Sequence, residues 1–152
     1  MKSIFRPLII ALLSLPLAVL AASDPEPTDP VLISVKDATA RHDYTKASAI
    51  LRDALAKAPA NAEYHNLYAY ALRKGANPDM DLVFKHYGEA LRINPKHRGA
   101  HEYIGEAYLM TGDLASAEKH LQALRSICTL SCEEMRDLQA AVEAHRRKTS
   151  AR

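Results

Sequence analysis

The two cysteines, Cys128 and Cys132, have the residue type and the spacing that most directly suggest chemistry. Residues four apart lie about 6 Å from each other even in a helix, which is within the Cα separation that a disulfide requires, and an oxidising compartment favours pairing. We therefore expect a structural disulfide that fixes the direction of the chain after the turn between them. Closing such a short loop contributes only about 2 kcal/mol in the chain-entropy description.

Two alternative roles for this cysteine pair stay open. Cys132 precedes a predicted helix, and the dipole at a helix N-terminus lowers the pKa of a thiol and raises its reactivity. Thiol oxidoreductases, however, normally carry a Cys-x-x-Cys pair on a different fold. Metal binding by the pair, together with a nearby His or Met, is the other role. A thiol- or metal-handling accessory factor is therefore the alternative function for this chain.

The seven histidines suggest a metal site, because His97 and His101 are four residues apart and would share one helix face. A zinc-protease helix needs a Glu directly after its first His, and Arg98 stands there instead. Side-chain packing or solvation explains these histidines better, so we predict no metal ligand. The five glycines form no phosphate-binding loop, and no Ser/His/Asp set is recognisable. The sequence thus predicts a chain that is not an enzyme and needs no cofactor.

The elements that would position such residues are helices in a repeating pattern. The segment from Gly105 to Glu118 places a Tyr three residues after a small residue, then a Gly-Asp turn, then a small residue in the next helix. This order is typical of the tetratricopeptide (TPR) unit, a helix–turn–helix of about 34 residues. Such units bury their apolar faces only by stacking, and the stack leaves a concave surface that usually binds another protein.

Two further copies follow from the spacing of small and large apolar residues. The second helix of each unit carries a small or slender residue, a larger apolar residue four positions later, and another apolar residue three positions after that. These triplets are Ala47/Leu51/Ala54, Val83/Tyr87/Ala90 and Ala117/Leu121/Leu124. Pro59 and Pro95 close the first two units 36 residues apart, whereas Thr129 departs from this pattern at the third. The matching close contacts of the first helices are Val35, Ala69 and Gly105.

These patterns predict an all-α fold, with three TPR-like helix pairs in a short right-handed superhelix and one capping helix after them. The three repeats together occupy residues 31–130, with approximate individual boundaries of 28–61, 62–97 and 98–131. The capping helix is expected over 131–148 and a tail over 149–152. Ser131, followed three residues later by Glu134, predicts a capping box at the start of the last helix. The first repeat lacks the turn glycine and has His42 before Asp43 instead.

The N-terminus has the features of a signal peptide. Two basic residues, Lys2 and Arg6, precede an apolar run over 8–20. Residues 1–22 are expected to be removed, which leaves a Pro-rich acidic leader over 23–30. The run is shorter than the roughly 20 residues of a membrane span. We therefore expect a periplasmic or secreted protein without stable membrane insertion after cleavage.

Removing this segment changes the charge balance. The whole chain has 20 Lys and Arg residues and 18 Asp and Glu residues, and without Lys2 and Arg6 the two classes are equal at 18 each. A mature chain with no net charge gives no electrostatic basis for binding nucleic acid or an anionic membrane. We therefore expect a protein or peptide partner, and we make no prediction of the oligomeric state.

Leu72-Arg73-Lys74, the run from Ala90 to Tyr108 and the segment Cys128-x-x-x-Cys132-Glu133-Glu134 form a combined pattern. Together they resemble a group of small exported bacterial tetratricopeptide proteins with a C-terminal Cys-x-x-x-Cys turn and one final helix. The resemblance covers about residues 60 to 145, and it implies the fold, export and a paired-cysteine feature. In that group aromatic residues and a Gly usually separate the cysteines, whereas this chain has Thr129-Leu130-Ser131 there.

First-helix residues that point away from the partner helix are expected to line the concave face. They are Leu32, Lys36 and Thr39 in the first repeat, Asn66, Tyr70 and Arg73 in the second, and Glu102, Glu106 and Leu109 in the third. The polar and aromatic members can hydrogen-bond or pack against an extended peptide, so they are the candidate ligand-binding residues. These candidates are Lys36, Asn66, Tyr70, Arg73, Glu102 and Glu106.

The Lys, Asn and Arg candidates have the residue types with which some tetratricopeptide domains hold a C-terminal carboxylate. Tyr70 interrupts that pattern, and Glu102 and Glu106 would repel a carboxylate. A mixed or basic ligand segment is equally compatible with these residues, and Tyr70 and Arg73 are expected to contribute most to binding. The predicted function is that of a periplasmic, non-enzymatic interaction module or scaffold.

Overall fold

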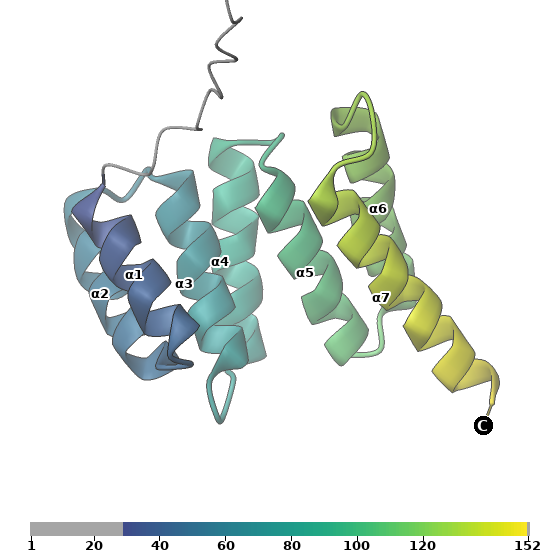
Figure 1. Cartoon of the computed structure of the whole chain (residues 1–152), viewed down its shortest axis with the longest axis horizontal. Helices are drawn as coiled ribbons and strands as arrows, with labels where there is room; N and C mark the ends of the chain where they lie inside the picture. Colours follow the sequence, from purple (N-terminus) through teal and green to yellow (C-terminus); the bar gives the residue numbers. More distant parts are fainter. Residues whose placement is uncertain (1–28, 152) are drawn as a thin grey trace, which may run out of the picture.

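The computed structural model describes residues 29–151, all of whose regular structure is α-helical. The predicted signal peptide and all but two residues of the predicted leader lie outside this range. Seven helices follow one another within the described residues (Figure 1). They are α1 (Pro30–Ala40), α2 (Tyr44–Lys57), α3 (Ala62–Lys74), α4 (Met80–Ile93), α5 (Arg98–Met110), α6 (Leu114–Ile127) and α7 (Glu133–Ser150). The prediction of an all-α helical-repeat fold is confirmed.

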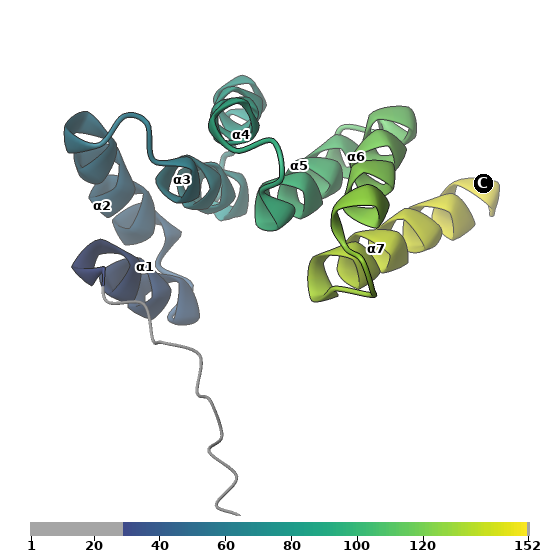
Figure 2. The ribbon, with the colours of Figure 1, turned by 90° about the horizontal axis from the view of Figure 1, so that it is seen from above.

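The helices form an arc whose two ends are α1 and α7. Figure 2 shows α1, α3, α5 and α7 along the inner side of the arc and α2, α4 and α6 on the outer side. This alternation follows from the repeat, because each helix pair contributes its first helix to the inside and its second to the outside. We call the inner side the concave face. None of the helices in residues 29–151 is long and apolar enough to cross a membrane.

Polar side chains at the helix starts explain where six of these helices begin. In each, the residue before the first turn accepts a hydrogen bond from a backbone N–H that the helix itself leaves without a partner. These capping residues are Asp29, Asp43, Asn61, Asp79, His97 and Asp113. Except for Asp29, which precedes α1, these caps lie in the connections between successive helices up to α6 and mark where each connection ends.

The tight turns of the first and third repeats have the same backbone despite their different sequences. Gly112 has a φ of +82°, and His42 takes the corresponding left-handed place with a φ of +58°. The backbone N–H of the following Asp43 donates to the Ala38 carbonyl at 2.9 Å, as that of Asp113 donates to the Tyr108 carbonyl at 2.9 Å. The first repeat therefore keeps the turn geometry without the glycine that normally permits it.

The core consists of the residues that the repeat spacing singles out. All nine members of the three predicted triplets are buried, with at most 8% of any one exposed. Leu138 and Val142 on α7 complete the third cluster of the core, which is why this helix caps the stack. Gly105 lets α7 approach closely, because a Cβ there would lie 2.6 Å from Leu138 Cδ2.

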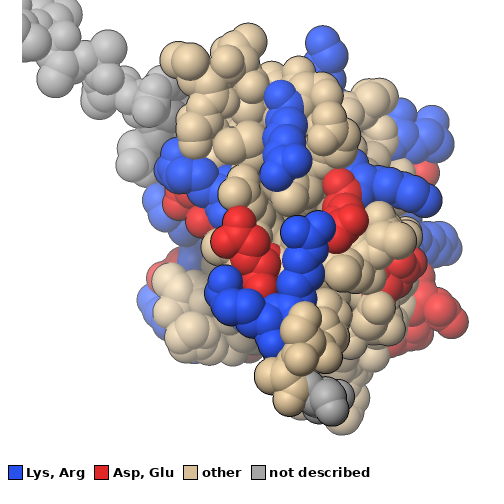
Figure 3. Space-filling view, turned by 90° about the vertical axis from the view of Figure 1, so that its right-hand side faces the viewer, with Lys and Arg blue, Asp and Glu red and all other residues tan. Residues whose placement is uncertain are grey.

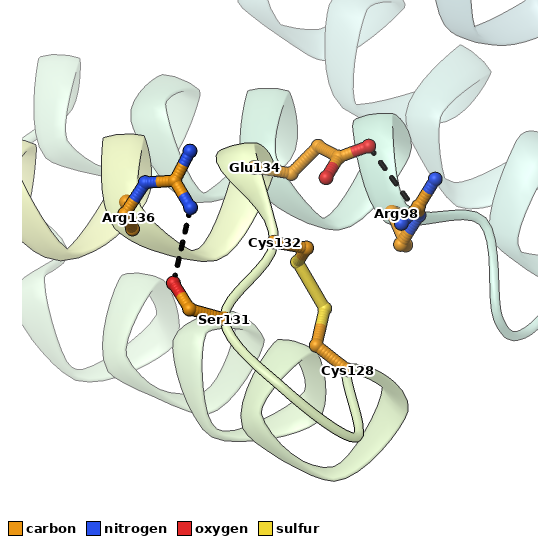
Figure 4. The surroundings of a disulfide bond; sticks show 6 residues. All are labelled: Arg98, Cys128, Ser131, Cys132, Glu134 and Arg136. Atoms are coloured by element: carbon orange, nitrogen blue, oxygen red, sulfur yellow. Dashed lines mark hydrogen bonds and ion pairs between the residues drawn. A yellow bond between two sulfur atoms is a disulfide. The ribbon is translucent and has the colours of Figure 1, made fainter. Parts of the chain in front are cut away.

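The start of α7 differs from the sequence prediction. The helix begins at Glu133, and Cys132 in the capping position makes no side-chain hydrogen bond, so the predicted capping box of Ser131 and Glu134 is wrong. The two side chains that were expected to form the capping box interact with two arginines instead (Figure 4). Arg136 Nη1 donates to Ser131 Oγ at 3.1 Å, and Arg98 Nε lies 3.4 Å from Glu134 Oε1.

A disulfide joins Cys128 and Cys132 across this turn, with 6.0 Å between the two Cα atoms. It connects the end of α6 to the start of α7 (Figure 4). Because α7 lacks a side-chain cap, this covalent link is the local feature that fixes where the helix begins.

Candidate functional site

The candidate residues on α3 and α5 lie on the concave face in two neighbouring groups. Spacings of three or four residues along each helix place them on one side of it. Tyr70, Arg73 and Glu106 come together in one group, and Asn66 and Glu102 lie in the other. The remaining candidate, Lys36, is exposed on α1 and borders neither group.

The first group, which we call the Arg73 cluster, is built around a buried guanidinium. Arg73 Nη2 donates to Glu106 Oε2 at 2.7 Å, and Arg73 Nε donates to the Tyr87 hydroxyl at 3.4 Å. The guanidinium carbon also lies 5.7 Å from the ring centroid of Tyr70 and 5.9 Å from that of Tyr103. These contacts connect α3, α4 and α5, and they occupy the arginine within the chain. Whether Tyr70 and Arg73 contribute to ligand binding stays a prediction.

The second group lines a pocket of about 430 Å³. It lies where α3, α5 and α7 begin, and we call it the α3–α5 pocket. Its lining residues come from α3, the α4–α5 turn, α5 and the first turn of α7. They are Glu63, Asn66, Leu67, Asn94, Lys96, His97, Arg98, Gly99, Glu102, Tyr103 and Glu134.

Two polar side chains of this pocket are largely buried and form no hydrogen bond with a described residue. Asn66 is 2% exposed, and its Oδ1 is the one buried side-chain polar atom within residues 29–151 that has no hydrogen-bond partner. Glu102 is 7% exposed, and its carboxyl makes no ion pair or hydrogen bond with any described residue. Burial raises the pKa of Glu102 to about 8, with further contributions from the charges of Glu106, Asp137 and Glu134.

Apart from the exposed Lys96, the other charged groups that line the pocket are already paired. His97 Nε2 lies 2.8 Å from Glu63 Oε2, and Arg98 pairs with Glu134 as described above. The position of Glu102 therefore leaves one buried carboxyl without a counter-charge. An unsatisfied buried group of this kind is uncommon in a folded protein and calls for a ligand, a water or a functional reason.

A second depression lies at the other end of α5, between this helix and α7. This α5–α7 pocket has a volume of about 360 Å³, and its lining includes Met110, whose side chain is 56% exposed. It is lined by Arg73, Glu106, Leu109, Met110, Ala141, Ala144, His145 and Lys148. Sequence reasoning missed the α7 contribution, although the spacing from Ala141 to Lys148 over two helical turns marks one face of that helix.

Four histidines form two equivalent pairs inside the second and third repeats. His65 Nδ1 lies 2.8 Å from His86 Nδ1, and His101 Nδ1 lies 2.9 Å from His120 Nδ1. In each pair the first-helix ring also donates its Nε2–H to a proline carbonyl, Pro59 at 2.9 Å and Pro95 at 3.1 Å. When both rings are neutral, the first ring then accepts at Nδ1 and the second donates there.

The histidine pairs occupy equivalent positions in the second and third repeats. His65 and His101, like Pro59 and Pro95, are 36 residues apart, a signal that alignment of the repeats would have revealed. His97 instead caps α5 and does not join His101. Among residues 29–151, no three His, Cys, Asp or Glu side chains lie close enough to hold a metal ion.

The surface at the α7 end carries charges of both signs. Figure 3 shows Lys and Arg side chains interspersed with Asp and Glu side chains over this face. One such pair joins the two last helices, with Arg146 Nη2 2.7 Å from Glu118 Oε1. The visible face therefore offers no broad basic patch of the kind that binds a phosphate backbone.

No protein-family model matches the sequence, and no curated protein matches it either. Solved structures match its fold. The TPR2B domain of yeast Sti1 in complex with pHsp70 has a TM-score of 0.69 and 18% identity, and the match covers 78% of this chain and 94% of that chain.

A second match is the Yersinia enterocolitica type III secretion translocator chaperone SycD, at a TM-score of 0.68, 15% identity and coverage of 79% and 83% of the two chains. SycD in complex with a peptide of the translocator YopD has a TM-score of 0.66 and 15% identity, with coverage of 78% and 92%. Identities of this size bear on the fold alone. The chain therefore has a helical-repeat fold similar to that of tetratricopeptide domains and of a TPR-like chaperone.

Proposed function

We propose that this chain is a non-enzymatic interaction module that holds a segment of a partner polypeptide on its concave face. The observation that carries the proposal is the state of two largely buried side chains: Asn66 Oδ1 is buried without a hydrogen-bond partner, and the Glu102 carboxyl makes no hydrogen bond or ion pair with any residue in 29–151. Leaving such groups unsatisfied costs free energy in the unbound protein, and a ligand that satisfies them recovers it. The α3–α5 and α5–α7 pockets then mark the two ends of the bound segment.

Two of the structural neighbours support this proposal through their own complexes. The yeast Sti1 domain was solved in a complex with pHsp70, and SycD was solved with a peptide of YopD. A helical repeat of this size is thus sufficient to bind a protein segment. The partner of the present chain is proposed from its own pockets, because identities below 20% carry no residue-level correspondence.

A capture experiment with crosslinking tests the proposal. The mature protein is immobilised and exposed to a periplasmic extract, and the variant Asn66→Ala/Met110→Ala, whose two positions line the α3–α5 and α5–α7 pockets, is compared with Leu130→Ala. Leu130 is a matched control because it is an apolar side chain, 85% exposed, in the disulfide turn. We expect the concave-face variant to reduce capture of a specific partner at least tenfold, about 1.4 kcal/mol, and the control to leave capture unchanged.

A third variant, Cys128→Ser/Cys132→Ser, separates this function from a thiol- or metal-handling role. The interaction module should lose a little thermal stability in this variant and keep its partner. Loss of capture with the cysteines, together with indifference to the concave-face substitutions, would overturn the proposal in favour of the accessory factor.

We also propose that the protein acts in the periplasm or outside the cell after removal of its N-terminal segment. The support is the charged and then apolar start of the sequence together with a cysteine pair that forms a disulfide. The intact mass of the exported protein should correspond to cleavage after Ala21 or Ala22. A mature chain that still contains residues 5–20 would contradict this localisation.

A further inference from the structure

We propose that the α3–α5 pocket takes a basic side chain of the partner polypeptide, an arginine in preference to a lysine, with Asn66 and Glu102 as its acceptors. This inference rests on the proposed function, and it names the chemistry of the bound segment.

The pocket offers acceptors from two different helices. Asn66 comes from α3 and Glu102 from α5, and both line the same space of about 430 Å³. Gly99 at the start of α5 lies beside Asn66 of α3, because a Cβ there would be in ordinary van der Waals contact with Asn66 Nδ2 at 3.4 Å. The Oδ1 atom of Asn66 accepts hydrogen bonds and donates none, and the Glu102 carboxyl does the same once a bound cation stabilises its ionised form against the raised pKa. Donors are what these two groups lack.

The charges around the pocket favour a cation over an anion. The nearest internal bases are committed, since His97 pairs with Glu63, Arg98 with Glu134, and Arg73 with Glu106. Lys96 reaches the pocket from the α4–α5 turn, but it is exposed and makes no ion pair with a described residue.

Glu102, in contrast, has no base paired with it, and the charges of Glu106, Asp137 and Glu134 add to burial in raising its pKa, partly offset by Arg73. Because Glu106 and Glu134 are themselves paired with arginines, an ionised Glu102 is the unbalanced charge among these groups, and it repels a C-terminal carboxylate and attracts a positive charge.

The geometry favours an arginine among cations. A metal ion would need several oxygen or nitrogen ligands converging on one point, and no three His, Cys, Asp or Glu side chains within residues 29–151 do so. A guanidinium carries five donors in one plane, so it can satisfy two acceptors on separate helices at once. Its flat face can also lie against the ring of Tyr103, which lines the same pocket.

Amide chemical shifts in two-dimensional NMR spectra of the mature protein give the test. The probes are four synthetic peptides, acetyl-Gly-Ser-Gly-X-Gly-Ser-Gly-amide, in which X is Arg, Lys, citrulline or Glu. Citrulline has nearly the shape of arginine without its charge. We expect the Arg peptide to shift the amides of Asn66, Gly99 and Glu102 saturably, with at least fivefold higher affinity than the citrulline peptide. We expect the Lys peptide to bind more weakly than Arg, and the Glu peptide not at all.

Two variants and one control assign the binding to this pocket. Glu102→Gln and Asn66→Ala should each weaken the Arg peptide at least fivefold. Glu89→Gln removes the same charge from α4 on the outer side of the arc, where Glu89 pairs with Arg92, and should change nothing. Circular dichroism verifies that each variant is folded. If Glu102→Gln does not fold, Asn66→Ala alone tests whether the Arg peptide binds in this pocket.

Equal binding of the Arg and citrulline peptides, or binding that survives both pocket variants, would overturn the assignment. This result is separable from failure of the proposed function. If partner capture depends on the concave face while the Arg peptide does not bind, the function stands and the basic-side-chain assignment is wrong. If the Arg peptide binds as expected but no partner is captured through the concave face, the site stands without that function.

Discussion

In the Arg73 cluster every charged side chain has a partner within the chain, whereas in the α3–α5 pocket Asn66 and Glu102 have none. The two groups lie on the same two helices, with Glu102 and Glu106 one turn apart on α5. A buried charge that is paired ties its surroundings together, and a buried polar group without a partner weakens the fold where it lies. The concave face is therefore not uniform: one part of it ties the repeats together, and the other is the part for which we propose a ligand.

Gly105 lies between Glu102 and Glu106 in the sequence and faces Leu138, so it sets the distance from α5 to α7. Its replacement by Leu should have the largest effect on the fold. A Cβ would already lie 2.6 Å from Leu138 Cδ2 and 2.7 Å from Leu138 Cδ1, and a full leucine side chain has no space beyond it. We expect a loss of about 3 kcal/mol, the upper end of the usual range for overpacking. Urea unfolding measures it, and an unchanged midpoint would mean that α5 and α7 do not pack as described.

The Arg73 cluster should respond strongly to loss of its cation. Arg73→Met keeps most of the buried hydrocarbon but leaves Glu106 and Tyr87 without their donor. Because the Glu106 side chain is still 31% exposed, we expect a loss of about 2–3 kcal/mol, below the full cost of stranding a buried charge.

Arg92→Met is the matched control for this comparison. Arg92 pairs with Glu89 at 2.6 Å, but its side chain is 69% exposed, so its loss should cost less than about 0.5 kcal/mol. Similar melting temperatures for the two variants would mean that the Arg73 cluster does not hold the repeats together.

The fold could be predicted from the sequence because the repeat leaves a pattern at fixed spacing. Small residues such as Ala47, Ala69 and Ala117 occur where two helices must approach, and each is 0% exposed. The chemical requirement at such a position, a side chain that occupies almost no space, is local and visible in the residue type. The same holds for Asp43 and Asp113, which cap their helices through their own side chains.

The division of the concave face could not be predicted in the same way. Periodicity places Asn66, Arg73 and Glu102 on the correct side of their helices, but it does not say which long side chain finds a partner. Arg73 reaches Glu106, which is 33 residues away in the sequence, and this contact depends on how the second and third repeats are rotated against each other. Ser131 and Glu134 illustrate the same limit, because Arg136 and Arg98 attract the groups that local rules assign to a cap.

The histidine pairs supply an intermediate case, since His86 and His120 are half-buried and ionise there only at a cost in free energy. Burial, followed by the facing ring, lowers the pKa of His86 and of His120 to about 4. A pKa lowered in the folded state contributes stability that is complete above the ordinary value of about 6.5 and is lost as the pH falls towards 4.

We expect the two pairs together to cost about 2 kcal/mol between pH 7 and pH 4, allowing for the solvent that reaches the rings. Urea unfolding over this pH range measures the loss in the parent chain. The variant His86→Phe/His120→Phe should show a smaller change between the two pH values. An equal change in both proteins would assign the acid sensitivity to other groups.

The smallest expected effect on stability tests the α3–α5 pocket directly. Burial and the acidic neighbours raise the pKa of Glu102 to about 8, so the unfolded chain ionises this group first. A pKa raised in the folded state contributes stability that is complete below the ordinary value of about 4.5 and is lost as the pH rises through 8. Glu102→Gln removes this titration, and it should make the protein more stable than the parent by about 1 kcal/mol at pH 9. The two proteins should have nearly equal stability at pH 4.

The difference between variant and parent is the decisive quantity, because the histidine pairs and all other titrating groups contribute equally to both proteins and cancel. Urea unfolding of the pair at pH 4, 6.5 and 9 therefore isolates Glu102. A difference that grows with pH means that the folded chain holds an ionised carboxylate there only at a cost, which is the condition under which a bound guanidinium is attracted. A difference that stays constant with pH would mean that Glu102 is solvated like any surface acid, and the contrast between the two polar regions of the concave face would disappear.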